Sequence, residues 1–206
     1  MVKRQQHSTP AEPVWCPLGT RRRGEILERA IFDAVLAELA EVGYDALTME
    51  GAAGRAHTGK AALYRRWSSK QALVLDALHR ALPPVDDPPD TGSVRGDLLA
   101  FLGRMADTIN SPTGAAMQAV VGHLKRHPDI AQAVQARVIE PRRRLIMDAL
   151  RRGADRGEVR PDAVTRLVAE VGPALIVHKF MTQGPPIPKK TVRAIVDEVI
   201  MPILRP

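Results

Sequence analysis

The sequence contains one cysteine, Cys16, among its 206 residues. A single cysteine cannot build a disulfide framework or a zinc site made of several thiolates. Long apolar runs are also missing, since no stretch reaches the roughly 18 apolar residues that a membrane-spanning helix needs. Residues 1–20 are polar and contain prolines, so they lack the apolar core of a secretory signal. We therefore expect a cytoplasmic protein that has no membrane partner.

Catalytic motifs are missing as well. The sequence has no glycine-rich phosphate loop, no H-E-x-x-H metal motif and no G-x-S-x-G nucleophile motif. His123 and His127 are four residues apart, but Pro128 follows directly and no carboxylate is placed to complete a metal site. Aromatic residues are scarce, at 3% of the chain, which argues against an aromatic cage for a planar cation. We therefore expect no enzymatic activity, no metal and no cofactor.

What the sequence does contain is enough apolar surface for a folded core and an excess of basic charge. Apolar residues make up 45% and charged residues 26%, as in ordinary globular chains. There are 30 Lys and Arg residues against 23 Asp and Glu residues, a formal net charge of +7. A basic balance points mildly to nucleic acid or another acidic surface as the partner.

Apolar residues recur at helical spacing through most of the chain, and no β-type alternation competes with them. Residues 1–19 lack this periodicity and are expected to form a disordered leader. The first helix should end at Gly43, and the proline-rich stretch 83–92 cannot be helical. The sequence therefore predicts an all-α fold of about nine helices, with a first domain at 20–82, a linker at 83–92 and a second domain at 93–206.

The most informative stretch of the first domain contains two short helices, at 48–56 and 60–67, joined by the turn 57–59. Thr48 is suited to cap the first of them, but Gly51 stands where a capping box would have a glutamate. Two short helices joined by a three-residue turn that contains glycine are typical of a helix-turn-helix. The second helix of such a unit enters the major groove of DNA.

Basic charge is concentrated in the same place. Charges of both signs are mixed along residues 82–206, whereas residues 55–70 carry no Asp or Glu. A local excess of positive charge is what phosphate neutralisation requires. The basic residues of this window are Arg55, Lys60, Arg65, Arg66 and Lys70.

The segment from Arg23 to Leu73 resembles the DNA-binding domain of the TetR family of bacterial transcriptional regulators. The resemblance rests on Ile26-Leu27-Glu28-Arg29-Ala30, Gly43-Tyr44, Leu47-Thr48, Ala56, the run Thr58-Gly59-Lys60-Ala61-Ala62-Leu63-Tyr64-Arg65-Arg66-Trp67 and the run Ser69-Lys70-Gln71-Ala72-Leu73. It covers about a quarter of the chain. The remaining helices fit the family's ligand-binding and dimerisation domain in number and length, but they carry no motif of similar sharpness.

The resemblance implies DNA contacts at several positions. Thr48, whose backbone N–H and hydroxyl lie at a helix N-terminus, is expected to hold a phosphate. Lys60 is expected to donate to a guanine or to a phosphate. The full set comprises Arg21, Arg22 and Arg23 as an arm that reaches the minor groove, Thr48, then Thr58, Gly59, Lys60 and Ala61 nearest the bases, and Tyr64, Arg65 and Lys70.

Several of these positions also have an ordinary structural interpretation. Tyr64 is alternatively a core aromatic, and Arg65 and Arg66 are alternatively solvated surface charges. The arginines at 21–23 are alternatively leader charge. Trp67 is interpreted as packing between helices and not as a DNA contact.

The turn departs from the family pattern. His57 stands where the family usually has glycine, and Thr58-Gly59 replace the common Val-Ser. Histidine adopts a left-handed backbone more readily than most residues, so a tight turn is still allowed. Gly51 and Gly54 each lower the intrinsic stability of the first short helix by about 1 kcal/mol relative to alanine. Packing is therefore expected to hold this unit together.

The resemblance further implies that residues 93–206 bind a small-molecule effector and form a homodimer. Pro141 is placed to open a helix over 142–156. Long helices at 162–183 and 189–204, with the small residues Gly172 and Ala174, would form a four-helix interface, although an internal core is the alternative. Methionines suit an adaptable apolar cavity or a filled core. Candidate effector-binding residues are Phe101, Met105, Met117, Val121, His123, Met147 and His178.

The sequence therefore predicts a ligand-responsive transcriptional regulator, with a repressor as the leading interpretation. It would bind a near-palindromic operator in double-stranded DNA as a homodimer, with one recognition helix in each half-site. A small, largely apolar molecule would release it. The alternative is a helix-turn-helix activator, or a DNA-binding protein without a small-molecule effector.

Overall fold

The computed structural model describes residues 24–124 and 126–206, which form helices joined by short connections and contain no strand. The predicted all-α class is confirmed. Two π-helical stretches lie within longer rods, so the described residues form nine helices and one 3₁₀ turn. None of these helices is long and apolar enough to cross a membrane. The predicted leader at 1–19, with Cys16, and the arginines at 21–23 lie outside the described residues.

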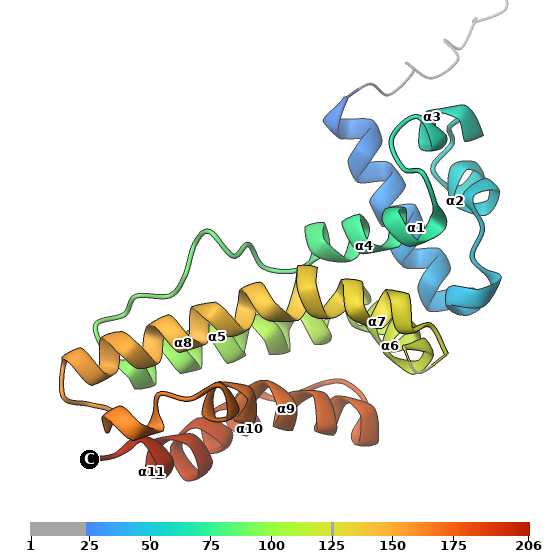
Figure 1. Ribbon diagram of the computed structural model, residues 1–206. Helices are drawn as coiled ribbons and strands as arrows, with labels where there is room; N and C mark the ends of the chain where they lie inside the picture. The colour runs from blue at the N-terminus through green and yellow to red at the C-terminus, as the bar shows by residue number, and fades with distance from the viewer. Residues whose placement is uncertain (1–23, 125) are drawn as a thin grey trace, which may run out of the picture.

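The first four helices contain the predicted helix-turn-helix (Figure 1). Gly43 interrupts regular helix geometry with a left-handed φ of 78°, as the sequence predicts. Ser69 caps the fourth helix, because its hydroxyl oxygen accepts a hydrogen bond from the Ala72 backbone N–H at 3.1 Å. The bounds are α1 Glu25–Ala46, α2 Met49–Arg55, α3 Lys60–Tyr64 and α4 Lys70–Ala81.

Five further helices follow the stretch 83–92, which is not helical. In Figure 1, α5 and the rod that contains α8 run side by side, and the last helices lie beneath them. The bounds are α5 Val94–Ile109, α6 Pro112–His123, a rod of α7 Pro128–Val134, η1 Gln135–Ile139 and α8 Glu140–Asp155, then η2 Pro161–Ala163, α9 Arg166–Gln183, and a last rod of α10 Lys189–Ala194, η3 Ile195–Ile200 and α11 Met201–Leu204.

The structure corrects two of the expected helix boundaries. Pro141 does not open a separate helix, because the π-helical stretch η1 precedes it and the chain stays helical from α7 to α8. The wider π turn accommodates a proline that would clash with an α-helical carbonyl. The helix expected from residue 162 begins at Arg166, since the Thr165 hydroxyl oxygen accepts a hydrogen bond from the Val168 N–H at 3.2 Å and so caps it.

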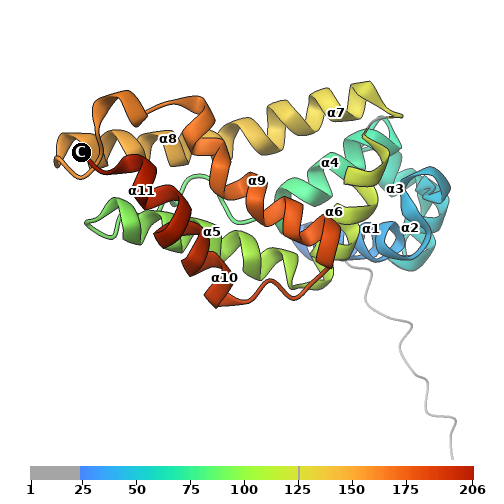
Figure 2. The ribbon, with the colours of Figure 1, turned by 90° about the horizontal axis from the view of Figure 1, so that it is seen from below.

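Two clusters of buried apolar side chains hold the helices together. The first cluster contains side chains from the helices α1, α2, α3 and α4 and from α6, α7 and η1, and it includes Leu39, Leu63 and Val120. The second joins α5, α8, α9 and the last rod, and includes Leu102 and Ile176. Helices that follow the stretch 83–92 therefore pack directly on α1 and α4 of the helix-turn-helix unit. Figure 2 shows that unit at one end of the molecule and the C-terminus at the other.

Candidate DNA interface

Thr48 caps the N-terminus of α2. Its Oγ1 accepts a hydrogen bond from the Gly51 backbone N–H at 2.9 Å, which confirms the predicted N-cap. The Thr48 backbone N–H, which the sequence suggested for a phosphate, instead donates to Glu38 Oε1 at 3.4 Å. The Thr48 side chain lies at the surface. Its hydroxyl is therefore the group left to donate to a phosphate.

The turn after α2 is a Schellman motif with histidine in its left-handed position. The Thr58 N–H donates to the Ala53 carbonyl and the His57 N–H donates to the Gly54 carbonyl, both at 3.0 Å. These are the two hydrogen bonds that define the motif. His57 has a φ of 53°, so it takes the conformation that glycine usually supplies. The sequence-based expectation of a tight turn is confirmed.

The variant His57→Gly should therefore be more stable than the wild type. A left-handed residue with a Cβ is strained by about 1–2 kcal/mol, and the greater chain entropy of glycine offsets part of the gain. We expect the free energy of unfolding in urea to rise by up to about 1 kcal/mol. The control His57→Val should lower it, because β-branched residues are the least suited to this conformation. Equal stability of all three proteins would contradict the role given to residue 57.

The first residues of α3 and one face of this helix are exposed. Lys60, Ala61, Tyr64 and Arg65 lie at the surface, while Leu63 is buried in the core. These positions share a face because helix neighbours are three or four residues apart. Tyr64 is 47% exposed, so it is not the core aromatic of the alternative interpretation. The Lys60 ammonium lies 5.5 Å from the centre of the Tyr64 ring.

Acidic side chains from neighbouring elements reach this basic region. Glu50 of α2 forms an ion pair with Lys60, and Glu41 of α1 forms one with Arg55. The hydrogen bond with Glu50 raises the pKa of Lys60 and lowers that of Glu50. Both pairs are solvent-exposed and contribute little to stability. A DNA contact by Lys60, as the sequence predicts it, would require the ammonium to give up this ion pair with Glu50.

Two other predicted positions serve the fold. Trp67 is 5% exposed and packs against Phe32, which confirms its packing interpretation. The Lys70 ammonium donates to the carbonyl oxygens of Tyr44 and Asp45 at 2.9 and 3.3 Å. It therefore ties the start of α4 to the end of α1, and in this arrangement it does not point freely toward a phosphate.

Sequence reasoning missed a cluster that links the end of α6 and the start of α7 to the end of α1, here called the histidine clasp (His123, His127 and Asp45). His127 Nε2 lies 3.0 Å from one Asp45 carboxylate oxygen, and His123 Nε2 lies 3.3 Å from the other. His123 Nδ1 also lies 2.6 Å from the Ala119 carbonyl oxygen. The carboxylate that meets the two histidines thus comes from a residue far away in the sequence. No group of three His, Cys, Asp or Glu side chains in residues 24–124 and 126–206 is arranged to hold a metal ion.

The clasp should make stability depend on pH in acid. The hydrogen bond from His127 holds the pKa of Asp45 below its ordinary value of 3.8, so the unfolded chain binds this proton more tightly than the folded one. The stabilisation is therefore present above about pH 4 and is lost as pH falls through the lowered pKa. Urea unfolding of wild type and Asp45→Asn between about pH 6 and pH 2.5 tests this. The difference between the two proteins should shrink toward acid, and a constant difference would refute the assignment.

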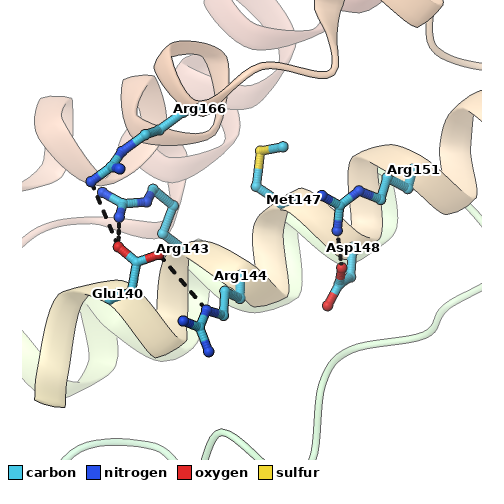
Figure 3. A pocket seen from close by; sticks show the side chains of 7 residues that line it. All are labelled: Glu140, Arg143, Arg144, Met147, Asp148, Arg151 and Arg166. Atoms are coloured by element: carbon cyan, nitrogen blue, oxygen red, sulfur yellow. Dashed lines mark hydrogen bonds and ion pairs between the residues drawn. The ribbon is translucent and has the colours of Figure 1, made fainter. Parts of the chain in front are cut away.

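A groove of about 360 Å³ lies between α8 and α9 (Figure 3). Arg143 is buried beside it and forms ion pairs with Glu140 and, at 2.7 Å, with Glu170. The groove is lined by Glu140, Arg143, Arg144, Met147, Asp148, Arg151 and Arg166. A second pocket of about 310 Å³ lies between α1 and α4 and is also lined by Thr113 of α6.

The predicted effector-binding residues do not meet in either of these pockets, apart from Met147, which lines the groove. His123 belongs to the clasp, and His178 is exposed on α9. The other four are only partly buried. Phe101 and Met105 pack against the second cluster and Met117 packs against the first. Val121 is on α6, the helix that also contains Met117.

The geometry of the helix-turn-helix agrees with comparisons against known proteins. Residues 31–77 match a family model described as bacterial regulatory proteins of the tetR family. Residues 88–199 match the model of a tetracyclin repressor-like C-terminal domain. The chain belongs to the TetR family. Members of this family are DNA-binding transcriptional regulators, so the helix-turn-helix of this TetR-family chain is its DNA-binding unit.

Relatives of this TetR-family chain extend over most of its length. An uncharacterised helix-turn-helix transcriptional regulator of Mycobacterium tuberculosis is 33% identical over 177 residues, which is 86% of this chain and 87% of the relative. The DNA-binding transcriptional repressor TetR of Mycobacteroides abscessus is 28% identical over 185 residues, or 89% and 97% of the two chains. The crystal structure of a TetR family transcription regulator superposes with a TM-score of 0.65 at 28% identity, covering 88% of this chain and all of the other.

Proposed function

We propose that this protein is a repressor that binds a near-palindromic operator as a homodimer and leaves it when a small molecule binds. The observation that carries the proposal is the exposed face of α3, where Lys60, Ala61, Tyr64 and Arg65 lie together at one end of the molecule. A helix that presents its first residues in this way fits the major groove. The similar protein of Mycobacteroides abscessus is named a repressor, which supports the sign of regulation.

An exposed apolar stripe on α9 supports the dimer. Leu167, Ala174, Val177 and Met181 are exposed, and their spacing places them along one side of the helix. Val199 of the last rod is also exposed. Apolar side chains in such a row become buried when two copies pair about a two-fold axis. Gly172 has a different role, because a Cβ there would meet Leu102 and Ile200 of the same chain.

Partly buried apolar side chains support an effector site in the second cluster. Phe101, Met105 and Met147 pack against this cluster without being fully covered. An apolar molecule lodged among them would complete their burial, and methionine side chains adapt easily to a guest. A thermal-shift screen with lipophilic compounds tests the effector. Saturable stabilisation supports it, whereas no shift with any compound favours the alternative of a regulator without a small-molecule effector.

Selection of bound sequences from random duplex DNA at about 150 mM salt tests the operator. We expect a two-fold symmetric motif whose half-sites are separated by about one helical turn. Binding without an enriched motif that disappears as salt rises would show only a nonspecific basic surface and would overturn the proposal.

Three variants should change affinity for the selected duplex in different directions. Lys60→Ala should weaken binding by about 5-fold or more, because it removes a contact to a base or a phosphate. Tyr64→Phe should weaken it by a few fold through loss of one hydroxyl contact. Glu50→Gln should strengthen binding, because Lys60 then has no ion pair with residue 50 to give up when it contacts DNA. Filter-binding titrations measure all three, and weaker binding by Glu50→Gln would contradict the role given to this pair.

A further inference from the structure

The N-terminus of α2 lacks the acidic residue that would complete its cap. In a capping box, the N-cap side chain accepts from the N3 backbone N–H, and a glutamate at N3 accepts from the N-cap backbone N–H. Thr48 performs the first half of this exchange with Gly51 at 2.9 Å. Gly51 occupies N3 and has no side chain to perform the second half. The Thr48 backbone N–H therefore needs an acceptor from elsewhere in the fold.

Glu38 of α1 supplies that acceptor. Its Oε1 lies 3.4 Å from the Thr48 backbone nitrogen, and the residue is 8% exposed although it carries a carboxylate. No Lys, Arg or His side chain among the described residues forms an ion pair with Glu38, and its Oε2 has no hydrogen-bond partner there. The partial positive charge of the α2 N-terminus is thus the feature that offsets burial of this carboxylate.

Residues 38 and 51 compete for the same space. A Cβ built on Gly51 would overlap Glu38 Oε1 and would lie 3.0 Å from its Cδ. A side chain at 51 would therefore displace the Glu38 carboxylate from its present place at the α2 N-terminus. The cap of α2 is thus completed by an acidic side chain of α1 in place of one within α2. The contact also joins α2 to α1.

We propose that Glu38 is a positioning residue for DNA binding, which it serves by completing the cap of α2 from α1 and fixing the end of the helix that presents Thr48. The proposal rests on the DNA-binding function above. It gives Glu38 no contact with DNA. Its effect passes through α2 to the turn at 57–59 and the first residues of α3, whose orientation depends on how α2 is seated on α1.

A double-mutant cycle tests this idea by moving the acid back to its local position. We expect Glu38→Ala to weaken binding of the selected duplex about 5-fold, the change in affinity that would follow if the stability of one helix cap were lost from the DNA-binding arrangement. Gly51→Glu alone should weaken binding further, because its side chain meets Glu38. The double variant Glu38→Ala/Gly51→Glu should bind within about 2-fold of wild type, since the introduced glutamate then caps Thr48 within α2.

Two further proteins separate positioning from general stability. Glu38→Gln keeps the shape and an acceptor oxygen, so it should stay folded and retain most of the affinity. Ile176→Val, in the core of the second cluster, should lower the melting temperature without changing DNA affinity. Melting temperatures without DNA should show the same rescue in the double variant as the binding data.

Two outcomes would overturn the proposal. One is wild-type affinity in folded Glu38→Ala. The other is an additive cycle, in which the double variant binds no better than the weaker single variant. Failure of the proposed function can be told apart from failure of this inference. If the proposed function is wrong, wild type selects no duplex, whereas the melting temperatures still show whether residues 38 and 51 are coupled.

Discussion

In the Trp67→Ala variant we expect the free energy of unfolding to fall by about 3–5 kcal/mol. The indole is buried in the segment that follows α3, with its ring edge-on to Phe32 at 5.5 Å between centroids. Its Nε1–H donates to Asp76 Oδ2 of α4 at 2.9 Å. Trp67 therefore joins the segment after α3 to α1 and α4, and its loss leaves both a cavity and an unpaired carboxylate oxygen. Urea unfolding followed by circular dichroism measures the change.

The variant Trp67→Phe separates the two contributions. Phenylalanine keeps an aromatic ring against Phe32 but cannot donate to Asp76, so we expect a smaller loss of about 1–2 kcal/mol. Asp76 would still have its ion pair with Arg137 at 3.4 Å. If the two substitutions were equally mild, the indole would not join these helices, and the packing interpretation of Trp67 would be wrong.

Local signals in the sequence were enough to predict the helix-turn-helix. Thr48 and Ser69 are caps whose partners lie three residues away, and Gly43 interrupts α1. The left-handed conformation of His57 belongs to a Schellman motif, whose hydrogen bonds also join residues close together in the sequence. Signals of this kind depend on neighbours within one helical turn, which a sequence displays directly.

Contacts between distant segments could not be predicted in the same way. Residues 55–70 contain no acid, yet α1 and α2 bring Glu41 and Glu50 onto Arg55 and Lys60. Asp45 meets two histidines about 80 positions later only because α6 packs on α1. Periodicity indicates which face of a helix is buried but not which helix covers it. The same gap explains why the candidate pocket residues were divided between two cores.

Pro141 gave a wrong helix boundary for a physical reason, whereas Pro202 lies inside a last helix that the sequence predicts over 189–204. A proline normally opens or ends an α-helix, because its ring clashes with the carbonyl of the preceding turn. Pro141 and Pro202 instead stand just after π-helical stretches, within rods that continue past them. The wider turn removes the clash, so each rod continues past its proline.

The double variant Leu167→Asp/Met181→Asp should be a monomer that has lost at least about 100-fold in affinity for the selected duplex. Leu167 is 74% exposed and Met181 is 41% exposed in the isolated chain, so aspartate at these positions does not disturb its core. In the proposed dimer each charge would be buried in the interface with the partner copy, which is strongly unfavourable. A monomer reads one half-site and loses the avidity of the second, which is worth about 100-fold or more. Sedimentation analysis and titration of the same preparation measure both effects.

Ile139→Asp is the matched control for this experiment. Ile139 is 43% exposed, close to Met181, but it lies on η1 and outside the α9 stripe. The control adds a negative charge at an exposed apolar position, so it should remain a dimer and keep wild-type affinity. Loss of dimers in both proteins would point to a general effect of charge, whereas dimers in both would place the interface elsewhere. An interface on α9 is supported only if the double variant is a monomer with weak affinity while Ile139→Asp is a dimer with wild-type affinity. Both readouts are needed because the proposed operator requires two recognition helices held at a fixed spacing.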